Sequence, residues 1–478
     1  MAVGSSNDFD VVVLGAGTGG YTAAFRAAQL GLRVALVDED KIGGTCLHRG
    51  CIPTKALLES AEVMNRAHHL KDYGVVLPGE PTVDYTQMAA RRDQVVKRMW
   101  TGLKTLVDKN KVVWVQGRGR LEGPGRVRVH QTAADGTPDG ERLLQATDII
   151  LATGSRVKSL PGLTPDGTRI VTSDDILRRA DVPKSIVIVG GGAVGVEFAS
   201  FYHDIGTAVT LLEYLPSLVP LEDREVSALI EKSFTRRGIK VMTKARFDAA
   251  KVQVTADGIC VDVGPEGAPT EEIRAETMLV ATGRAANTEG IGLETTRVEL
   301  DKGVVKVNGR MRTREPHVYA IGDLIGGLWL AHVAAHEGII AAHVIAGESD
   351  VHEMDYVRQP RATYCRPEIA SIGLTTQQCE AQGLPTKVGK MPFQAIAKAL
   401  VGGEYEGFVK VIGHAETDDT LGIHIVGPHA TDLIAEASVA FSLDATPWEI
   451  GAATHAHPTL AEAIGEAAMA VDGRSINF

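Results

Sequence analysis

A glycine pattern that occurs twice in this 478-residue chain constrains its fold more than any other feature. The first copy, DVVVLGAGTGGYTAAFRAAQLGLRVALVD, reads as an apolar strand, a turn with Gly15, Gly17 and Gly20, an Ala-rich helix and a second strand. Glycine there permits a tight turn, lets the backbone approach a pyrophosphate, and lets the helix pack closely on the strand. The second strand ends at Asp38, 23 residues after Gly15, where a carboxylate can accept a ribose hydroxyl. This copy predicts a dinucleotide-binding α/β unit.

The second copy begins 175 residues later, with Gly190, Gly192 and Gly195 in the turn and Glu213 at the end of the next strand. The spacing from first glycine to acid is again 23 residues, so we predict two dinucleotide sites on one chain. A carboxylate accepts the hydroxyls of an NAD ribose, whereas a 2′-phosphate would meet like charge, at a cost on the order of several kcal/mol. Residues 214–216 supply no arginine to compensate, which favours NAD over NADP.

Two cysteines, Cys46 and Cys51, lie in the stretch GGTCLHRGCIPTK. Within one regular helix this spacing would separate them by about 7.5 Å and turn their side chains about 140° apart, which prevents a disulfide. We therefore expect a helix that begins near Cys51, with Cys46 in a bend before it, Gly50 loosening the approach and Pro53 in the first turn. A helix start favours the reactive thiolate. The alternatives to redox chemistry are a structural disulfide or two idle thiols.

The first glycine unit followed by GGTC-x4-C-IPTK resembles the FAD-dependent pyridine nucleotide-disulfide oxidoreductases of class I, over nearly the whole chain. The resemblance implies FAD at the first glycine unit and NAD at the second, with Cys51 facing the flavin and Cys46 exchanging with substrate. Lys55 shares a helix face with Cys51 and is implied to lie beside the flavin, unless it is a solvated surface lysine. Glu197, which we expect at the start of the second unit's helix, complements the helix dipole, pairs with Lys55 as the resemblance implies, or does both.

The resemblance implies further residues near the two cofactors. The strand in TDIILATGS closes the first nucleotide unit, MLVATGRAAN closes the second, and HVYAIGD precedes a turn and an apolar helix. No metal site is expected. The remaining residues implied to bind a cofactor are Gly44, Gly119, Thr153, Gly154, Asp323, Leu330, Ala331 and His332 at FAD, and Gly283 at NAD.

The pattern changes after residue 350 to α+β without a glycine fingerprint. We expect strands at PRATYC, IASIGL, EGFVKVIG and LGIHIVG, one helix among them and two helices at the end. The expected fold class is thus α/β, with two Rossmann-like dinucleotide-binding domains and a C-terminal α+β domain that the resemblance assigns to dimerisation. The expected divisions are an FAD-binding domain with the cysteine pair (1–155), an NAD-binding domain (156–284), a central segment that completes the FAD site (285–350) and the dimerisation domain (351–478).

Near the C-terminus, Thr459-x-x-Glu462 stands ahead of an Ala-rich helix as a capping box, which is a sufficient structural reason for both residues. The resemblance implies in addition that Glu462 orients His457 as an acid/base that takes a proton from a dithiol in the partner subunit's site. His455 is expected to pack. An apolar stripe on the same helix would serve either a protein interface or, more commonly, the chain's own core. It comprises Leu460, Ile464, Ala467, Ala468 and Val471.

Charge and cysteine content exclude some classes of protein. Lys and Arg number 49 against 60 Asp and Glu, and the net charge of −11 argues against a nucleic-acid or anionic-membrane binder. Five scattered cysteines indicate a reducing compartment, and Cys260, Cys365 and Cys379 are expected to be packing residues. The stretch MAVGSSNDFD carries no targeting signal and no apolar run reaches about 18 residues. We therefore expect a soluble cytoplasmic protein.

The resemblance implies an enzyme that oxidises a protein-bound dihydrolipoyl group with NAD⁺, through a Cys46–Cys51 disulfide and FAD, as a homodimer. Its partner would be the lipoyl domain of a 2-oxo acid dehydrogenase or glycine-cleavage complex. Glutathione and trypanothione reductases would require arginines at the second nucleotide site, and mercuric reductase would require a C-terminal cysteine pair. The sequence shows neither feature. The alternatives are a disulfide or quinone reductase of the same family and a flavin- and NAD-binding redox sensor.

Overall fold

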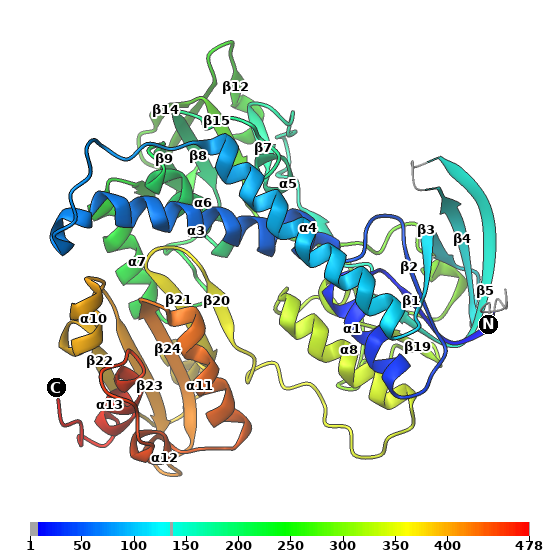
Figure 1. The fold of residues 1–478 in the computed structure, drawn as a ribbon. Coiled ribbons are helices and arrows are strands. Elements are labelled where there is room, and N and C mark those ends of the chain that lie inside the picture. Colours follow the sequence, from blue (N-terminus) through cyan, green and yellow to red (C-terminus); the bar gives the residue numbers. More distant parts are fainter. Residues whose placement is uncertain (1–7, 134–136, 478) are drawn as a thin grey trace. The chain divides into compact units, whose positions relative to one another are not determined.

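The computed structural model describes residues 8–133 and 137–477 and shows a mixed α/β protein (Figure 1). The chain divides into two compact units, each assembled from three stretches of sequence. The first unit comprises residues 1–56, 89–158 and 283–356, and the second comprises residues 57–88, 159–282 and 357–478. Helices α3 (Cys51–His68) and α4 (Tyr85–Lys109) each begin in one unit and end in the other.

A six-stranded sheet forms the centre of the first unit. Its parallel part has the order β3-β2-β1-β5-β19, and β4 pairs antiparallel with both β3 and β5. The short strands β1, β2 and β19 each contain an unbroken apolar run of three or four residues, as expected for a parallel sheet that is covered on both faces. The strands are β1 (Asp8–Leu14), β2 (Val34–Asp38), β3 (Val113–Leu121), β4 (Arg126–Thr132), β5 (Pro138–Leu151) and β19 (Val318–Ala320).

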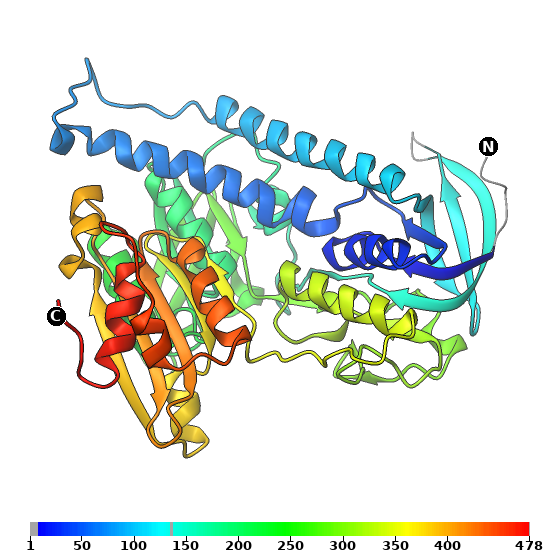
Figure 2. The ribbon, with the colours of Figure 1, turned by 60° about the horizontal axis from the view of Figure 1, so that its bottom comes forward.

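Helices α1 (Thr18–Gln29) and α8 (Ala331–Ile345) lie side by side against one face of this sheet (Figure 2). A Cβ atom on Gly338 would lie 2.7 Å from the carbonyl oxygen of Gly19, so the close approach of the two helices depends on glycine. The other face is covered by apolar residues of the segment 286–329. Smaller elements of this unit are α2 (Gly44–Arg49), β6 (Ser155–Val157), β16 (Arg284–Ala286), η3 (Leu293–Thr295), β17 (Leu300–Asp301), β18 (Val304–Val305) and η4 (Gly322–Ile325).

The second unit contains a parallel sheet of order β10-β9-β8-β15-β7, which repeats the arrangement of glycine loop, helix and strand. A small antiparallel sheet of β11 to β14 adjoins it. The strands are β7 (Ile170–Thr172), β8 (Ser185–Val189), β9 (Ala208–Leu212), β10 (Lys240–Met242), β11 (Ala245–Arg246), β12 (Gln253–Val254), β13 (Ile259–Pro265), β14 (Glu271–Ala275) and β15 (Thr277–Val280). The helical segments are η1 (Leu70–Tyr73), α5 (Ser173–Ile176), α6 (Ala193–Asp204), α7 (Arg224–Arg237) and η2 (Ala249–Lys251).

The C-terminal part of the second unit is an antiparallel sheet of order β20-β21-β24-β23-β22. Helices α11 and α13 cover one of its faces (Figure 2), where they share a single apolar core with the sheet. The strands are β20 (Arg361–Thr363), β21 (Glu368–Gly373), β22 (Thr386–Pro392), β23 (Phe408–His414) and β24 (Thr420–Gly427). The helical segments are α9 (Thr376–Ala381), η5 (Phe393–Ala395), α10 (Ala397–Gly402), α11 (Ala430–Ser442), α12 (Pro447–Ala452) and α13 (Glu462–Ala470).

Three expectations for this part are corrected. Strand β22 was not expected, and two helices (α9 and α10) rather than one lie among the strands. Three helices rather than two follow the last strand. The apolar stripe of α13 belongs to the chain's own core, because Ile464 and Ala467 are fully buried against the sheet. The stripe is therefore not an exposed interface.

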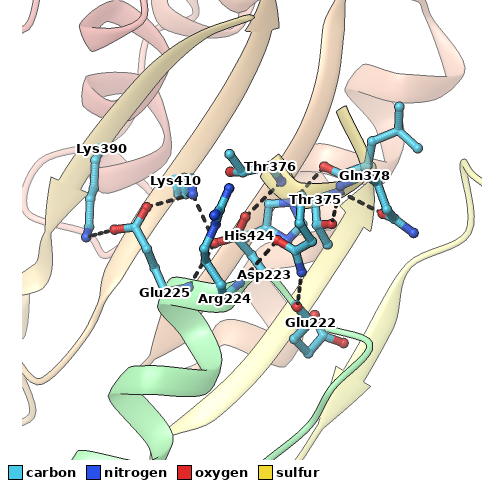
Figure 3. A network of polar contacts seen from close by, with 12 residues as sticks. Glu222, Asp223, Arg224, Glu225, Thr375, Thr376, Gln378, Lys390, Lys410 and His424 are labelled. Carbon is cyan, nitrogen blue, oxygen red and sulfur yellow. Dashed lines mark hydrogen bonds and ion pairs between the residues drawn. The ribbon is translucent and has the colours of Figure 1, made fainter. Parts of the chain in front are cut away.

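The opposite face of the C-terminal sheet packs against α6 and α7 through a shared core and a buried polar network (Figure 3). Asp223, which caps α7, is 0 % exposed and accepts hydrogen bonds from the Thr376 N–H at 2.9 Å and the Lys410 Nζ at 2.9 Å. Lys410 itself is 2 % exposed and also bonds Glu225 at 2.7 Å. Burial alone would raise the pKa of Asp223, but these donors and the Glu225 N–H hold it well below its usual range.

Candidate active site

Four parallel strands of the first unit end at the same edge of the sheet. Leu14 of β1 is in register with Val37 of β2 and with Leu151 of β5, and Leu151 is in register with Ala320 of β19. Open α/β sheets bind ligands outside the carboxyl ends of their strands. The residues predicted at FAD that the structure brings to this edge are Gly15, Gly17, Gly20, Asp38, Thr153, Gly154 and Asp323.

The first glycine loop leaves space at the N-terminus of α1. Gly15 has a φ of +107°, and a Cβ on Gly20 would lie 1.8 Å from the Gly15 carbonyl oxygen, so both positions require glycine. No atom lies within 4 Å of the place that a Cβ on Gly17 would occupy. Because the first N–H groups of a helix have no partner inside it, this open helix start fits a pyrophosphate.

Asp38 closes the same loop from the end of β2. Its Oδ2 accepts a hydrogen bond from the Ala16 N–H at 2.6 Å and its Oδ1 accepts one from the Asp40 N–H at 2.9 Å. Burial raises the pKa of Asp38, and the two backbone donors offset part of that effect. Each carboxylate oxygen keeps a second lone pair, so Asp38 can still accept a ribose hydroxyl.

Asp323 lies in the turn after β19 and is held from two sides. The Ser155 hydroxyl donates to its Oδ2, and the guanidinium Nε of Arg284 lies 3.8 Å from the same oxygen. Thr153 is tied in turn to Asn287, whose side-chain amide donates to the Thr153 carbonyl at 2.9 Å. The arrangement fixes a carboxylate at the edge of the sheet where FAD is predicted to bind.

Other residues predicted at FAD lie in the same unit. Leu330 is the N-cap of α8, and Ala331 and His332 form its first turn. Gly119 lies in β3, where a Cβ would stand 2.3 Å from the Leu14 side chain, so packing alone requires glycine there. The contact of these four residues with FAD stays a prediction.

The cysteine pair lies against the first glycine loop. Gly44, with a φ of +58°, would place a Cβ 2.6 Å from the Gly17 Cα, so α2 packs on the start of α1. α3 begins at Cys51 as predicted, but Cys46 lies within the short helix α2 rather than in a bend. Gly50 separates the two helices, so the two cysteines do not lie in one continuous helix, as their spacing predicted.

The two thiols form one hydrogen-bonded pair in the reduced state. The hydrogen bond with Cys51 and then burial raise the pKa of the Cys46 thiol well above its usual range, whereas Thr18 and the Lys55 ammonium lower it. Lys55 is half-buried on α3, so it is not a solvated surface lysine. A positive charge and a helix start at this pair are what a thiolate requires.

The second glycine loop repeats the geometry of the first. Gly190 has a φ of +111°, a Cβ on Gly195 would lie 1.8 Å from the Gly190 carbonyl oxygen, and the space next to Gly192 is open. Glu213 accepts hydrogen bonds from the Gly191 N–H at 2.6 Å and the Leu215 N–H at 2.7 Å. This loop therefore fits a second nucleotide by the same criteria as the first.

An arginine beside Glu213 was missed. The guanidinium carbon of Arg246 lies 3.4 Å from the centre of the Tyr214 ring, and its Nη1 donates to the Tyr214 carbonyl at 2.7 Å. Strand β11, which carries Arg246, is brought there by the hydrogen bond from the Ala245 N–H to the Glu213 carbonyl. No local sequence signal indicates this arginine, because it comes from 32 residues further along the chain.

Two further residues predicted near a cofactor are Glu197, in the second unit, and Gly283, in the first. Glu197 is buried in the second turn of α6, which begins at Ala193, so it does not begin the helix as expected. Its carboxylate accepts a hydrogen bond from the Tyr364 N–H at 2.9 Å. Gly283, with a φ of +114°, follows β15. The pairing of Glu197 with Lys55 and the contact of Gly283 with NAD stay predictions.

A histidine and a glutamate form a pair just before α13. The Nδ1 of His457 lies 2.8 Å from an Oε1 of Glu462, while the other carboxylate oxygen accepts from the Thr459 N–H at 2.9 Å. That N–H and then His457 lower the pKa of Glu462. The His457 side chain is 71 % exposed. A carboxylate that fixes one ring nitrogen leaves the other available for proton transfer.

The predicted capping box is only half formed. The Glu462 carboxylate bonds the Thr459 backbone as predicted, but the Thr459 hydroxyl donates to the Ala456 carbonyl, and α13 begins only at Glu462. Glu462 thus serves both the backbone and His457. His455 packs as expected, half-buried with its Nε2 2.8 Å from Glu436.

The buried cysteines Cys260, Cys365 and Cys379 are confirmed as packing residues, and no disulfide occurs within residues 8–133 and 137–477. No helix in the part of the chain that the structure describes is long and apolar enough to cross a membrane. The first unit thus holds the cysteine pair and one glycine loop, and the second holds the other loop and the histidine pair.

Comparison with known proteins identifies the class. Residues 9–338 match the pyridine nucleotide-disulphide oxidoreductases, and residues 359–468 match the dimerisation domain of the same proteins. The chain belongs to the pyridine nucleotide-disulphide oxidoreductase family. Members of this family use FAD and a pyridine nucleotide, which agrees with the two glycine loops.

Several relatives match over their full length. The dihydrolipoyl dehydrogenase of Bacillus subtilis is 47 % identical, with 99 % of this chain and 100 % of the relative covered. The dihydrolipoyl dehydrogenase of Zymomonas mobilis is 42 % identical over the same shares. The crystal structure of LpdA from Mycobacterium tuberculosis superposes with a TM-score of 0.86 at 30 % identity, with 96 % of this chain and 98 % of LpdA covered.

Proposed function

We propose that this chain is a dihydrolipoyl dehydrogenase, which oxidises a dihydrolipoyl group to its cyclic disulfide with NAD⁺. The observation that carries the proposal is the Cys46–Cys51 pair, which is packed on a glycine loop that fits FAD and faces the positive charge of Lys55. The full-length similarity to dihydrolipoyl dehydrogenases supports the choice of substrate.

The cysteine pair and His457 account for the exchange of bonds. His457 takes the proton of one dihydrolipoyl thiol, and the resulting thiolate attacks the Cys46 sulfur, which breaks the Cys46–Cys51 bond and leaves Cys51 as a thiolate. The second substrate sulfur then attacks the first substrate sulfur, which breaks the mixed disulfide. Its proton passes to the departing Cys46 sulfur, which leaves as a thiol. The product is a cyclic disulfide, and the two electrons now reside on the cysteine pair. FAD held at the first glycine loop would supply a two-electron acceptor between the reduced cysteine pair and NAD⁺.

The hydrogen bond between the two thiols fits this division of roles. The hydrogen bond and burial raise the pKa of the Cys46 thiol, which fits a role for Cys51, at the start of α3, as the thiolate of the reduced pair. Glu462 holds the Nδ1 of His457, so the Nε2 carries the proton that is exchanged.

His457 is proposed to act in the site of the partner subunit of a homodimer. The family's dimerisation domain covers it, and its side chain is largely exposed in the single chain. We retain the division into 1–155, 156–284, 285–350 and 351–478 as a functional proposal, and the cytoplasm as the proposed location. The proposed protein partner is a lipoyl domain of a 2-oxo acid dehydrogenase or glycine-cleavage complex.

A steady-state assay with free dihydrolipoamide and NAD⁺ tests the reaction. Rapid turnover that is lost in both Cys51→Ser and His457→Gln is expected. If the holoenzyme carries FAD but does not oxidise dihydrolipoamide, the proposed substrate is wrong and the chain is a redox sensor or another reductase of the family.

Subunit exchange tests the action in trans. A dimer formed from one Cys51→Ser chain and one His457→Gln chain has one site with both changes and one with neither. Random exchange of the two nearly inactive proteins should then restore about a quarter of wild-type activity, because half the dimers carry one intact site. No recovery after verified exchange would place His457 in the site of its own chain.

A further inference from the structure

A buried glutamate lies directly behind the turn that carries Asp323. Glu337 is on α8, in the middle of the first unit, and is 1 % exposed. Its Oε2 accepts a hydrogen bond from the Gly322 N–H at 2.6 Å, and its Oε1 accepts one from the Tyr356 hydroxyl at 3.0 Å. Neither the thiol exchange nor the nucleotide contacts described above use this carboxyl group.

The turn that carries Asp323 is packed closely against α8. Gly322 has a φ of +70°, and a Cβ there would lie 3.3 Å from the Ala334 side chain, so the turn is pressed against α8. Asp323 follows directly and is aimed at Ser155 and Arg284. The Gly322 N–H is therefore the link through which the position of α8 determines the position of Asp323.

We propose that Glu337 is a positioning residue for FAD: its carboxylate holds the Gly322–Asp323 turn, and the chain retains FAD more tightly when Glu337 is ionised. The inference rests on the proposed role of Asp323 at the cofactor. An ionised acceptor makes a hydrogen bond roughly twice as strong as a neutral one. Ionised Glu337 therefore fixes the Gly322 N–H more firmly than the protonated acid does.

The ionisation falls in the physiological range for an identifiable reason. Burial raises the pKa of Glu337 to about 7, with a further increase from the charge of Asp323, while Gly322 and Tyr356 lower it. Asp323 is the charged group that faces Glu337 from η4, and Tyr356 is the titratable group that faces it from the segment after α8. From α1, the residues packed on α8 near this position are the uncharged Gly19 and Ala23.

Tyr356 can serve both forms of the acid. Its hydroxyl donates to the carboxylate when Glu337 is ionised, and it can accept from the carboxylic acid when Glu337 is protonated. The backbone donor at Gly322 has no such freedom. Ionisation of Glu337 therefore changes mainly the strength of its hydrogen bond to the Gly322 N–H, on the side where FAD is proposed to bind.

The test is the rate at which the holoenzyme releases FAD. The holoenzyme is diluted at pH values between 6 and 8, and the release is monitored by the fluorescence of free FAD. The wild-type release rate is expected to fall by roughly tenfold as the pH rises, because a tenfold change corresponds to about 1.4 kcal/mol, the size of a charge-assisted gain. Glu337→Gln should release FAD at the rate of wild type at pH 6 throughout this range.

Two further variants make the test specific. Tyr356→Phe removes a donor to the carboxylate, so the fall in release rate should move to higher pH. Glu348→Gln, at an exposed position after the same helix, should behave as wild type. The inference is overturned if FAD is bound but wild type and Glu337→Gln show the same pH dependence, or if Glu348→Gln changes it equally. A chain that does not bind FAD at all would instead contradict the proposed function.

Discussion

The two glycine loops of this chain have the same backbone geometry, but different segments pack against them. The first glycine has a φ of +107° in one loop and +111° in the other. In each loop a Cβ added to the third glycine would lie 1.8 Å from the carbonyl oxygen of the first. An acid at the end of the next strand bonds the same backbone position in both, at 2.6 Å. The first loop is covered by a helix that carries a cysteine, whereas Glu213 of the second is followed by a tyrosine stacked with an arginine.

The difference shows that the loop provides a place for a pyrophosphate and that the neighbouring segments provide the chemistry. Gly44 brings Cys46 to the first loop, and β11 brings Arg246 to the second. The same contrast holds for buried carboxyl groups. Asp223 in the second unit has a lysine and two backbone donors, whereas Glu337 in the first unit has two donors and a like charge.

The largest effect is expected from removal of the exchange thiol, which only the first loop has. Cys46→Ser should lower lipoamide turnover by about a thousandfold or more, because no other group can form the mixed disulfide. FAD content and electron transfer from NADH to a dye should be retained. Cys260→Ser, a buried thiol of the second unit, is the control and should keep full activity. Retained lipoamide turnover in Cys46→Ser would contradict the assignment.

Gly44→Ala should disrupt the first loop alone. The added methyl group would press on Gly17 at 2.6 Å in a left-handed backbone, so the affinity for FAD is expected to fall by roughly ten- to a hundredfold, measured by equilibrium dialysis. Gly74→Ala has a similar φ of +75° without any neighbour within 4 Å and should leave the affinity unchanged. Gly192→Ala should raise the KM for NAD⁺ and leave FAD bound. Equal FAD loss in Gly44→Ala and Gly74→Ala would show that strain, not packing, matters.

The two buried carboxyl groups should give opposite pH dependence. The pKa of Asp223 is lowered in the folded chain, so its contribution is fully present above its unfolded pKa of about 3.9 and is lost only in strong acid. Asp223→Asn should therefore lower the unfolding free energy by about 3 kcal/mol throughout pH 5.5 to 8. Asp181→Asn, a surface partner of Arg179, should cost less than about 0.5 kcal/mol.

Glu337 should change the free energy of unfolding with pH in the opposite direction. Its pKa is raised to about 7, so the unfolded chain releases this proton first, and stability falls as the pH rises from about 4.5 to 7. Glu337→Gln should remove this fall, which chemical denaturation at pH 5.5 and 8 would detect. The contrast between the two units is wrong if Asp223→Asn and Glu337→Gln shift stability in the same direction at pH 8.

The smallest effect is expected at the nucleotide preference of the second loop. Wild type should use NAD(H) in strong preference to NADP(H), and Glu213→Ala should narrow the ratio of kcat/KM values by about tenfold. Removal of the carboxylate costs NAD binding and also exposes a 2′-phosphate to Arg246. The double variant with Arg246→Ala should lose any gain in NADP use. Equal use of both nucleotides by wild type would contradict the role of Glu213.

The sequence by itself determined the two glycine loops, their strands and the start of α3 at Cys51. These features follow from local causes, because a positive φ requires glycine and a strand covered on both faces requires an unbroken apolar run. The His457–Glu462 pair could also be predicted from the sequence, because the two residues are only five positions apart. Strand β22 was not, because it is an edge strand with few buried side chains and is defined by its pairing with β23.

Only the tertiary structure decided which distant groups meet. Arg246 reaches Tyr214 from strand β11. Lys410, on β23 of the C-terminal sheet, reaches Asp223 at the start of α7. Glu337 reaches Gly322 because α8 packs on the turn that precedes it. Each contact depends on packing between distant segments, and neither local sequence indicates which segment it will meet. A pKa near neutrality at Glu337 likewise depends on burial, which is a property of the folded chain and not of the residue.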